Sequence, residues 1–273
     1  MTRSKRHSRS ALVGAFDILG LKRLMRTTDL LELSDQLECL IQILRGCGEE
    51  PCVFEVGGRR SSGVPVVLQA SDSFVVFSDV KSDADVVQLL WNVHHLIFHA
   101  IQRELPIRGA IAYGEALVQT EPPIFIGPAV AEAFEWEKRQ AWAGACLAPS
   151  LESHVSRSHL GEALFPLVVP YALPLHEDRQ DGLAVNWTSD AFYFMEPSHA
   201  RTKFRDCPAS DPDYPRVMEK VNNTVQFLDH CLGIKREHGY FLGPTNRRVV
   251  LGPVEDRYRL VRIVTVPNDI GRA

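Results

Sequence analysis

Two strand-like apolar runs in the first third of the chain each end at a carboxylate. The run 11–16 is followed by Asp17, which predicts a buried strand with a polar tip. The β-rich runs 64–70 and 74–77 flank a tight turn with Asp72 at its apex. If these strands share one sheet, both carboxylates can meet at the same edge.

Helical spacing dominates between these strands and after them. Apolar residues repeat every three or four positions in five segments, residues 19–27, 30–44, 83–105, 128–142 and 217–232. Further strand patterns follow at 107–113, 116–118, 167–173, 183–187, 247–251 and 258–266, the last two as a C-terminal hairpin. This order predicts an α+β fold with one sheet and helices packed on one face.

Composition narrows the class of protein. The 273 residues suit one elaborated domain or two small ones, and 45% hydrophobic with 23% charged residues is typical of a globular chain. The formal net charge of -4 argues against a nucleic-acid partner. Six cysteines without a C-x-x-C pair indicate reduced thiols, no structural zinc and a cytoplasmic location.

The first ten residues carry four basic side chains and are expected to form a flexible arm. The apolar run that follows is interrupted at Asp17, so it fits neither a signal peptide nor a membrane span. We therefore expect no stable membrane insertion.

The two carboxylates suggest a site for a hard divalent cation. Mg²⁺ and Mn²⁺ take oxygen ligands, and Asp17, Asp72 and the backbone carbonyl of Ile18 would supply three. A helix N-cap role for Asp17 and a turn role for Asp72 explain the same residues without a metal. Spacing alone leaves both interpretations open.

Four segments of the chain form a recurring combination of motifs. They are Ala15–Leu21 (AFDILGL), Ser71–Ser78 (SDSFVVFS), Ile107–Glu115 (IRGAIAYGE) and Ile126–Glu137 (IGPAVAEAFEWE). In order and in spacing they resemble the motifs of class III nucleotide cyclases. More narrowly, they are similar to the bacterial branch that makes pyrimidine cyclic nucleotides in the Pycsar anti-phage system. The resemblance covers roughly residues 10–150 and extends more loosely to 205.

The resemblance implies a ferredoxin-like palm sheet and catalysis by two metal ions, Mn²⁺ or Mg²⁺, held by Asp17 and Asp72 with the Ile18 carbonyl. It also implies that backbone N–H groups of residues 16–20, which include Phe16, Ile18, Leu19 and Gly20, bind the triphosphate at the start of the next helix. One ion would activate the 3′-hydroxyl and the other would neutralise the pyrophosphate. The expected domains are an arm over 1–10, a catalytic domain over 11–205, and a C-terminal helix and hairpin over 206–273.

Departures from the family pattern bear on the substrate. Leu68 and Ile124 stand where purine-specific enzymes carry polar base-reading side chains, so purine recognition is disfavoured. The resemblance then favours UTP, with CTP as the alternative. Ala131 and Glu135 replace an Asn and a catalytic Arg, and Arg139 is the hypothetical replacement for that cation, with Lys138 as its alternative. An adenylate cyclase and a silent nucleotide-binding pseudo-cyclase remain rival interpretations, as does a polymerase-like palm.

By the same resemblance, the sites form between the protomers of a head-to-tail homodimer, and the product signals to a separate cyclic-nucleotide-binding effector. Other polar residues are weaker candidates. Arg108 is interpreted first as the ion-pair partner of a neighbouring carboxylate. His94 and His95 are interpreted as packed helix residues. Arg201 and Lys203 are the remaining candidate triphosphate cations.

Overall fold

A computed structural model describes most of the chain between residues 9 and 238. The described residues are 9–46, 52–56, 58–61, 63–119, 124–158, 160, 164–188, 195, 201, 209–238, 244–245, 248–249 and 262–265. The basic segment 1–8 and Lys203 lie outside them.

The main sheet has eight strands in the order β4-β5-β1-β6-β8-β10-β9, with β7 paired to β6. Its β6–β8 pair is parallel and its other ladders are antiparallel, so the sheet is mixed. The strands are β1 (Arg9–Ile18), β4 (Val66–Ala70), β5 (Ser73–Asp79), β6 (Ile107–Gln119), β7 (Ile124–Ile126), β8 (Gly144–Leu147), β9 (Val168–Pro174) and β10 (Arg179–Val185).

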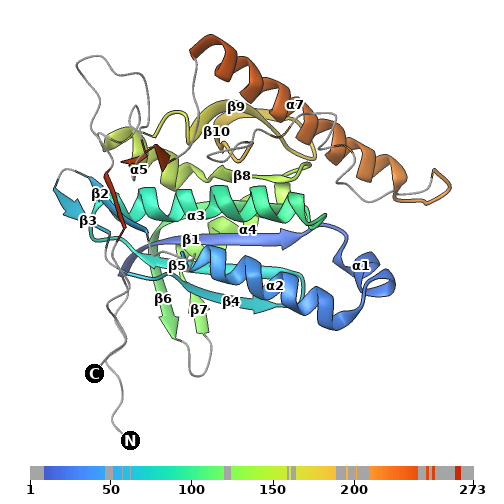
Figure 1. Cartoon of the computed structure of the whole chain (residues 1–273), viewed down its shortest axis with the longest axis horizontal. Coiled ribbons are helices and arrows are strands. Elements are labelled where there is room, and N and C mark those ends of the chain that lie inside the picture. The colour runs from blue at the N-terminus through green and yellow to red at the C-terminus, as the bar shows by residue number, and fades with distance from the viewer. Residues whose placement is uncertain are drawn as a thin grey trace, which may run out of the picture.

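Helices pack on this sheet, which confirms the α+β class. Figure 1 shows α2 and α3 in front of the sheet and α4 behind β1, so the second face also carries a helix. The helices are α1 (Leu21–Thr27), α2 (Leu30–Leu44), α3 (Asp83–Gln102), α4 (Pro128–Arg139), α5 (Pro149–Arg157) and α7 (Tyr214–His238). No described helix has the length and apolar character needed to cross a membrane.

Small side chains explain why α4 lies close to the sheet. Ala15 on β1 pairs with Ala110 on β6, and a Cβ added at Gly114 would contact Ala129 of α4 at 3.6 Å. Alternate residues of a strand face the same side, so this alanine and glycine row faces α4. The opposite face of β1 carries Phe16, a fully buried core residue.

The last long helix shares its core with the sheet. Phe227 of α7 is fully buried and packs edge-on against Trp142, with ring centroids 4.8 Å apart. The Thr224 hydroxyl accepts a hydrogen bond from the Ala143 amide at 2.8 Å. The Asn223 side chain donates to the Ala141 carbonyl, also at 2.8 Å. α7 is thereby fixed next to the segment that joins α4 to β8.

Of the hairpin expected between 247–251 and 258–266, only residues 248–249 and 262–265 belong to the described part of the chain. A short hairpin is present, but it is formed by β11 (Pro244–Thr245) and β12 (Arg248–Val249). β13 (Arg262–Thr265) instead pairs antiparallel with β2 (Cys52–Val56), which also pairs with β3 (Arg59–Arg60). Strand periodicity predicts that a segment needs a partner, but not which edge supplies it.

Candidate functional site

The two carboxylates lie at one end of the sheet, Asp17 on β1 and Asp72 in the turn that joins β4 to the neighbouring strand β5. Asp17 occupies the end of β1 and pairs in register with Ser73, the first residue of β5. The Ile18 amide donates a hydrogen bond of 2.9 Å to the backbone carbonyl of Asp72 in the β4–β5 turn. The antiparallel ladder therefore holds the turn of the second carboxylate beside the strand of the first.

The electrostatics of Asp17 indicate a place where positive charge is favourable. Burial raises the pKa of its carboxyl group, Arg108 opposes that shift, the Asp72 charge adds to it, and Lys220 opposes it. The effect of Asp72 means that the two carboxylates are close enough to repel each other. A cation bound between them would relieve both the burial penalty and the repulsion.

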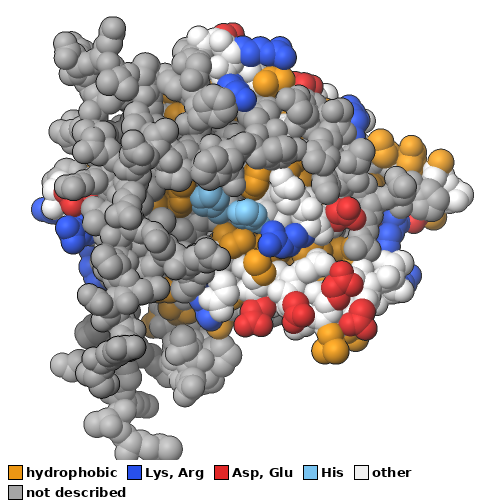
Figure 2. Space-filling view, in the orientation of Figure 1, with side chains coloured by type: hydrophobic (Ala, Val, Ile, Leu, Met, Phe, Trp, Pro, Cys, Tyr) orange, Lys and Arg blue, Asp and Glu red, His pale blue; other side chains and the backbone are white. Residues whose placement is uncertain are grey.

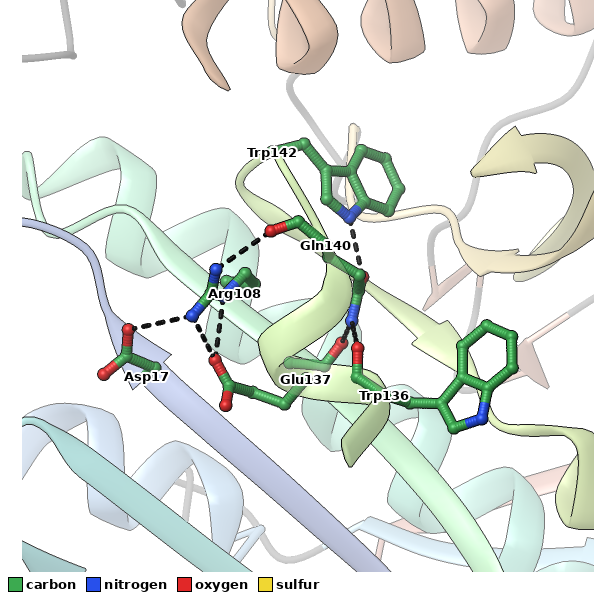
Figure 3. Close-up of polar contacts among 7 residues, drawn as sticks. Asp17, Arg108, Trp136, Glu137, Gln140 and Trp142 are labelled. Carbon is green, nitrogen blue, oxygen red and sulfur yellow. Dashed lines mark hydrogen bonds and ion pairs between the residues drawn. The ribbon is translucent and has the colours of Figure 1, made fainter. Parts of the chain in front are cut away.

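Arg108 connects this carboxylate pair to α4 (Figure 3). Its Nε donates to Oε1 of Glu137 at 2.8 Å, its Nη1 donates to the Gln140 carbonyl at 2.9 Å, and its Nη2 forms an ion pair with the same Oε1 of Glu137 at 2.6 Å. The same Nη2 lies 3.5 Å from Oδ2 of Asp17. These contacts agree with the interpretation of Arg108 as the ion-pair partner of a neighbouring carboxylate. Its closer carboxylate partner is Glu137 on α4.

The residues behind Arg108 are held in a buried hydrogen-bonded network. Gln140 is fully buried, and its side chain donates to the carbonyls of Gly109 at 2.8 Å and Trp136 at 3.0 Å. Trp142 donates its indole N–H to Oε1 of Gln140 at 2.7 Å. Burial raises the pKa of Glu137 against the opposing charge of Arg108. Such a network limits movement of the Arg108 guanidinium.

Lys220 of α7 is a member of the site that the sequence pattern did not single out. Burial and the nearby Arg108 charge lower its pKa, while Asp17 and Glu137 oppose that shift. An ion pair between Arg23 on α1 and Asp211 further ties the chain just before α7 to the segment after β1. Lys220 lies in an ordinary helical pattern, so only the docking of α7 places it near Asp17.

The donor set fits a hard divalent cation. Among the described residues no group of three or more His, Cys, Asp or Glu side chains is arranged to hold a metal ion. Mg²⁺ is commonly held by one or two carboxylates, with substrate phosphates and water completing its shell. Asp17 and Asp72 supply two carboxylates, and burial together with the nearby Asp72 charge raises the pKa of Asp17. The metal roles of these residues and of the Ile18 carbonyl stay predictions.

In the segment 16–20, whose binding of phosphate stays a prediction, two backbone amides already have partners in the chain. The amides of Ile18 and Leu19 already donate to the carbonyls of Asp72 and Pro106, at 2.9 and 2.8 Å. Phe16 is fully buried in the core. Gly20 adopts a φ of 79°, and the space around its missing Cβ is open. Sheet pairing thus uses two of the amides expected to bind the triphosphate, and open space remains at Gly20.

Of the two candidate base-pocket residues, Leu68 lies on the same face of the sheet as Asp17, whereas Ile124 lies far from Asp17. Leu68 is half-buried and pairs with Val75, which pairs with Ala15, so Leu68 shares the Asp17 face of the sheet. Ile124 pairs with Gln119 at the far end of β6. Asp17 pairs with residue 108 and Ile124 with residue 119 of this strand. Residues 108 and 119 are eleven positions apart, which at about 3.3 Å per residue corresponds to roughly 35 Å along the strand.

Two of the other cationic candidates, Arg139 and Arg201, have partners other than Asp17. The Arg139 guanidinium is exposed, stacks 4.4 Å from the Trp136 ring centroid and contacts Oε1 of Gln180 at 3.5 Å. It is not among the charges that shift the Asp17 pKa. Arg201 donates to Oδ1 of Asn222 at 3.1 Å.

The histidine candidates belong to the packing of α3. The rings of His94 and His95 meet edge to face, with centroids 4.8 Å apart. Both also contact the Trp91 ring, with centroid separations of 5.4 and 4.7 Å. These contacts agree with their interpretation as packed helix residues.

Comparison with known proteins gives no sequence relative. No family model and no curated protein matches the chain. The adenylyl cyclase CyaB of P. aeruginosa is 14% identical with a TM-score of 0.46, over 67% of this chain and 96% of that one.

Two further solved structures are similar at a comparable level. The catalytic core of a rhodopsin-guanylyl cyclase with converted specificity, in complex with ATPαS, is 13% identical over 67% of this chain and 98% of that chain, with a TM-score of 0.44. An adenylate cyclase of Trypanosoma brucei is 12% identical over 68% of this chain and 93% of that chain, with a TM-score of 0.42. Values this low do not by themselves assign a family or an activity.

Proposed function

We propose that the chain is a nucleotide cyclase that converts a pyrimidine nucleoside triphosphate, UTP in the first place, to its 3′,5′-cyclic monophosphate and pyrophosphate. The observation that carries the proposal is the adjacency of Asp17 and Asp72, two carboxylates from motifs separated in sequence. The four motifs that resemble class III cyclases support the same assignment. Leu68 and Ile124, which are apolar, favour a pyrimidine over a purine.

In this proposal the acidic side chains bind the metal ions and a basic side chain attracts the phosphates. Asp17 and Asp72, with the Ile18 carbonyl, would hold the divalent ions, which when bound lower the pKa of the 3′-hydroxyl and neutralise charge on the pyrophosphate. Lys220, whose charge interacts with those of Asp17 and Glu137, would attract the phosphate oxygens. The open space at Gly20 leaves room for the phosphate chain beside β1.

The spacing of the candidate residues favours a homodimer. Asp17 and Ile124 lie roughly 35 Å apart along β6 at about 3.3 Å per residue, further than one nucleotide reaches. Both can contact a single substrate only if a second copy of the chain supplies one of them. A head-to-tail two-fold dimer provides that arrangement twice.

The proposed product is a second messenger. By the resemblance to the Pycsar branch, it would act in the cytoplasm on a separate cyclic-nucleotide-binding effector during anti-phage defence. This role rests on the motif resemblance, and it requires that the chain first be a pyrimidine cyclase.

The test is product analysis with each ribonucleoside triphosphate. The purified chain is incubated with ATP, GTP, CTP or UTP and Mn²⁺, and the products are identified by liquid chromatography and mass spectrometry. Cyclic UMP that disappears in Asp17→Asn supports the proposal, and cyclic CMP alone would move the assignment to a cytidylate cyclase. Cyclic AMP would identify an adenylate cyclase, linear dinucleotides a polymerase, and binding without turnover a pseudo-cyclase.

A further inference from the structure

The Arg108 guanidinium stands between two carboxylates that it does not contact equally. Its Nη2 is 2.6 Å from Oε1 of Glu137 but 3.5 Å from Oδ2 of Asp17. The guanidinium also donates a charge-assisted hydrogen bond of 2.8 Å from Nε to Glu137, whereas a separation of 3.5 Å from Asp17 is at the limit of a hydrogen bond. The positive charge of Arg108 therefore acts on the Asp17 carboxylate, but Asp17 does not hold the guanidinium in place.

The remaining donors of Arg108 are also directed to α4 and the residue after it. Nε donates to Glu137 and Nη1 to the Gln140 carbonyl, so three contacts hold the guanidinium on that side (Figure 3). An arginine side chain is always charged and has no acceptor, so its position depends on which anions surround it. Without the Glu137 charge, Asp17 would become the nearest carboxylate partner in this network.

The two carboxylates differ in exposure. Glu137 is 4% exposed and lies on the buried side of α4, where its partner is the guanidinium. The side chain of Asp17 is 24% exposed, so an ion from solvent can reach it. An arginine drawn fully onto Asp17 would occupy a carboxylate oxygen that a divalent ion needs.

We infer that Glu137 is a positioning residue that holds Arg108 back from Asp17 and so keeps the Asp17 carboxylate available to a divalent cation. The inference rests on the metal site of the proposed function and assigns to Glu137 a role in metal affinity. Residues that orient metal ligands from outside the coordination shell typically change metal affinity about 10- to 100-fold when replaced.

The test measures Mn²⁺ binding directly, without turnover. Electron paramagnetic resonance follows free Mn²⁺ during titration of the nucleotide-free chain. Glu137→Gln keeps the shape of the side chain but removes its charge, and we expect Mn²⁺ affinity to fall about tenfold. Glu38→Gln makes the same change on the exposed face of α2 and should leave the affinity unchanged.

A double variant separates positioning from simple damage to the fold. In Arg108→Gln/Glu137→Gln neither buried charge remains, and the competing cation is gone, so Mn²⁺ affinity should return to that of the unsubstituted chain. Affinity in the double variant below that of Glu137→Gln would overturn the inference. Thermal unfolding of each variant shows that the binding is measured on folded protein.

The outcomes also separate this inference from the proposed function. If the unsubstituted chain binds Mn²⁺ and Glu137→Gln binds it equally well, the role of Glu137 is wrong while the metal site stands. If the unsubstituted chain binds no Mn²⁺, both are overturned. Weakened binding in Glu137→Gln that is restored in the double variant supports both.

Discussion

The Ile18 amide donates to the Asp72 carbonyl at 2.9 Å, and this one backbone bond joins the two halves of the candidate site. It places the residue after the first carboxylate against the residue that carries the second. Because it is a backbone bond at the end of a ladder, side-chain substitutions at Asp17 or Asp72 leave it in place. The two carboxylates can therefore be replaced with little risk to the sheet.

Asp72→Asn tests whether the second carboxylate belongs to the site. It removes one of the charges that raise the Asp17 pKa, so that pKa should fall toward its ordinary value. Mn²⁺ affinity and the yield of cyclic product should each decrease about a hundredfold. Replacing a residue that binds the metal directly should reduce metal affinity at least as much as replacing one that only orients a ligand. Asp35→Asn on the exposed face of α2 is the matched control. Unchanged Mn²⁺ binding in Asp72→Asn would remove this residue from the site.

Lys220→Met tests the contribution of α7 to substrate binding. The substitution keeps the length of the half-buried side chain and removes its charge. Loss of one charge-assisted contact to a phosphate should raise the KM for the triphosphate roughly tenfold or more, with a smaller change in kcat. Steady-state kinetics against Lys81→Met, an exposed lysine before α3, measures the difference. Equal KM values in the two variants would contradict the assignment.

The lowered pKa of His95 should make the fold less stable in mild acid. Burial first, and then the neighbouring His94 and His99, hold the pKa of His95 well below 6.5. The unfolded chain binds a proton at this residue near pH 6.5 and the folded chain does not, so the free energy of unfolding falls as pH drops from 7 toward 5. Urea unfolding at both pH values should give a smaller difference for His95→Gln. An identical pH dependence in the variant would count against this origin.

Alanine substitutions at two glycines should change the stability of the fold in opposite directions. A Cβ at Gly109 would overlap the Phe16 ring and lie 3.0 Å from the Ala15 carbonyl oxygen, so Gly109→Ala should destabilise the fold by about 1–3 kcal/mol. Gly233 lies in α7 with nothing near its missing Cβ, and Gly233→Ala should stabilise by about 0.5–1 kcal/mol. Urea midpoints of the two variants on either side of the unsubstituted value are the expected result.

Elements with strong local patterns were predicted closely from sequence. The helix expected over 83–105 is α3 (Asp83–Gln102), and the strand expected over 11–16 is the centre of β1 (Arg9–Ile18). The helix expected over 217–232 is the central part of α7 (Tyr214–His238). In these segments periodicity, capping residues and proline act between neighbours in the chain, so the sequence carries their signal directly.

The sequence by itself determined the α+β class, the two carboxylates at strand tips and the motifs that suggest cyclase chemistry. Only the tertiary structure decided that Glu137 is the main partner of Arg108, that Lys220 comes close enough to Asp17 for their charges to influence each other, and that Ile18 and Leu19 use their amides in backbone pairing. These relationships join residues far apart in the chain. They depend on strand register and on how α4 and α7 dock, which local hydrophobic spacing does not encode.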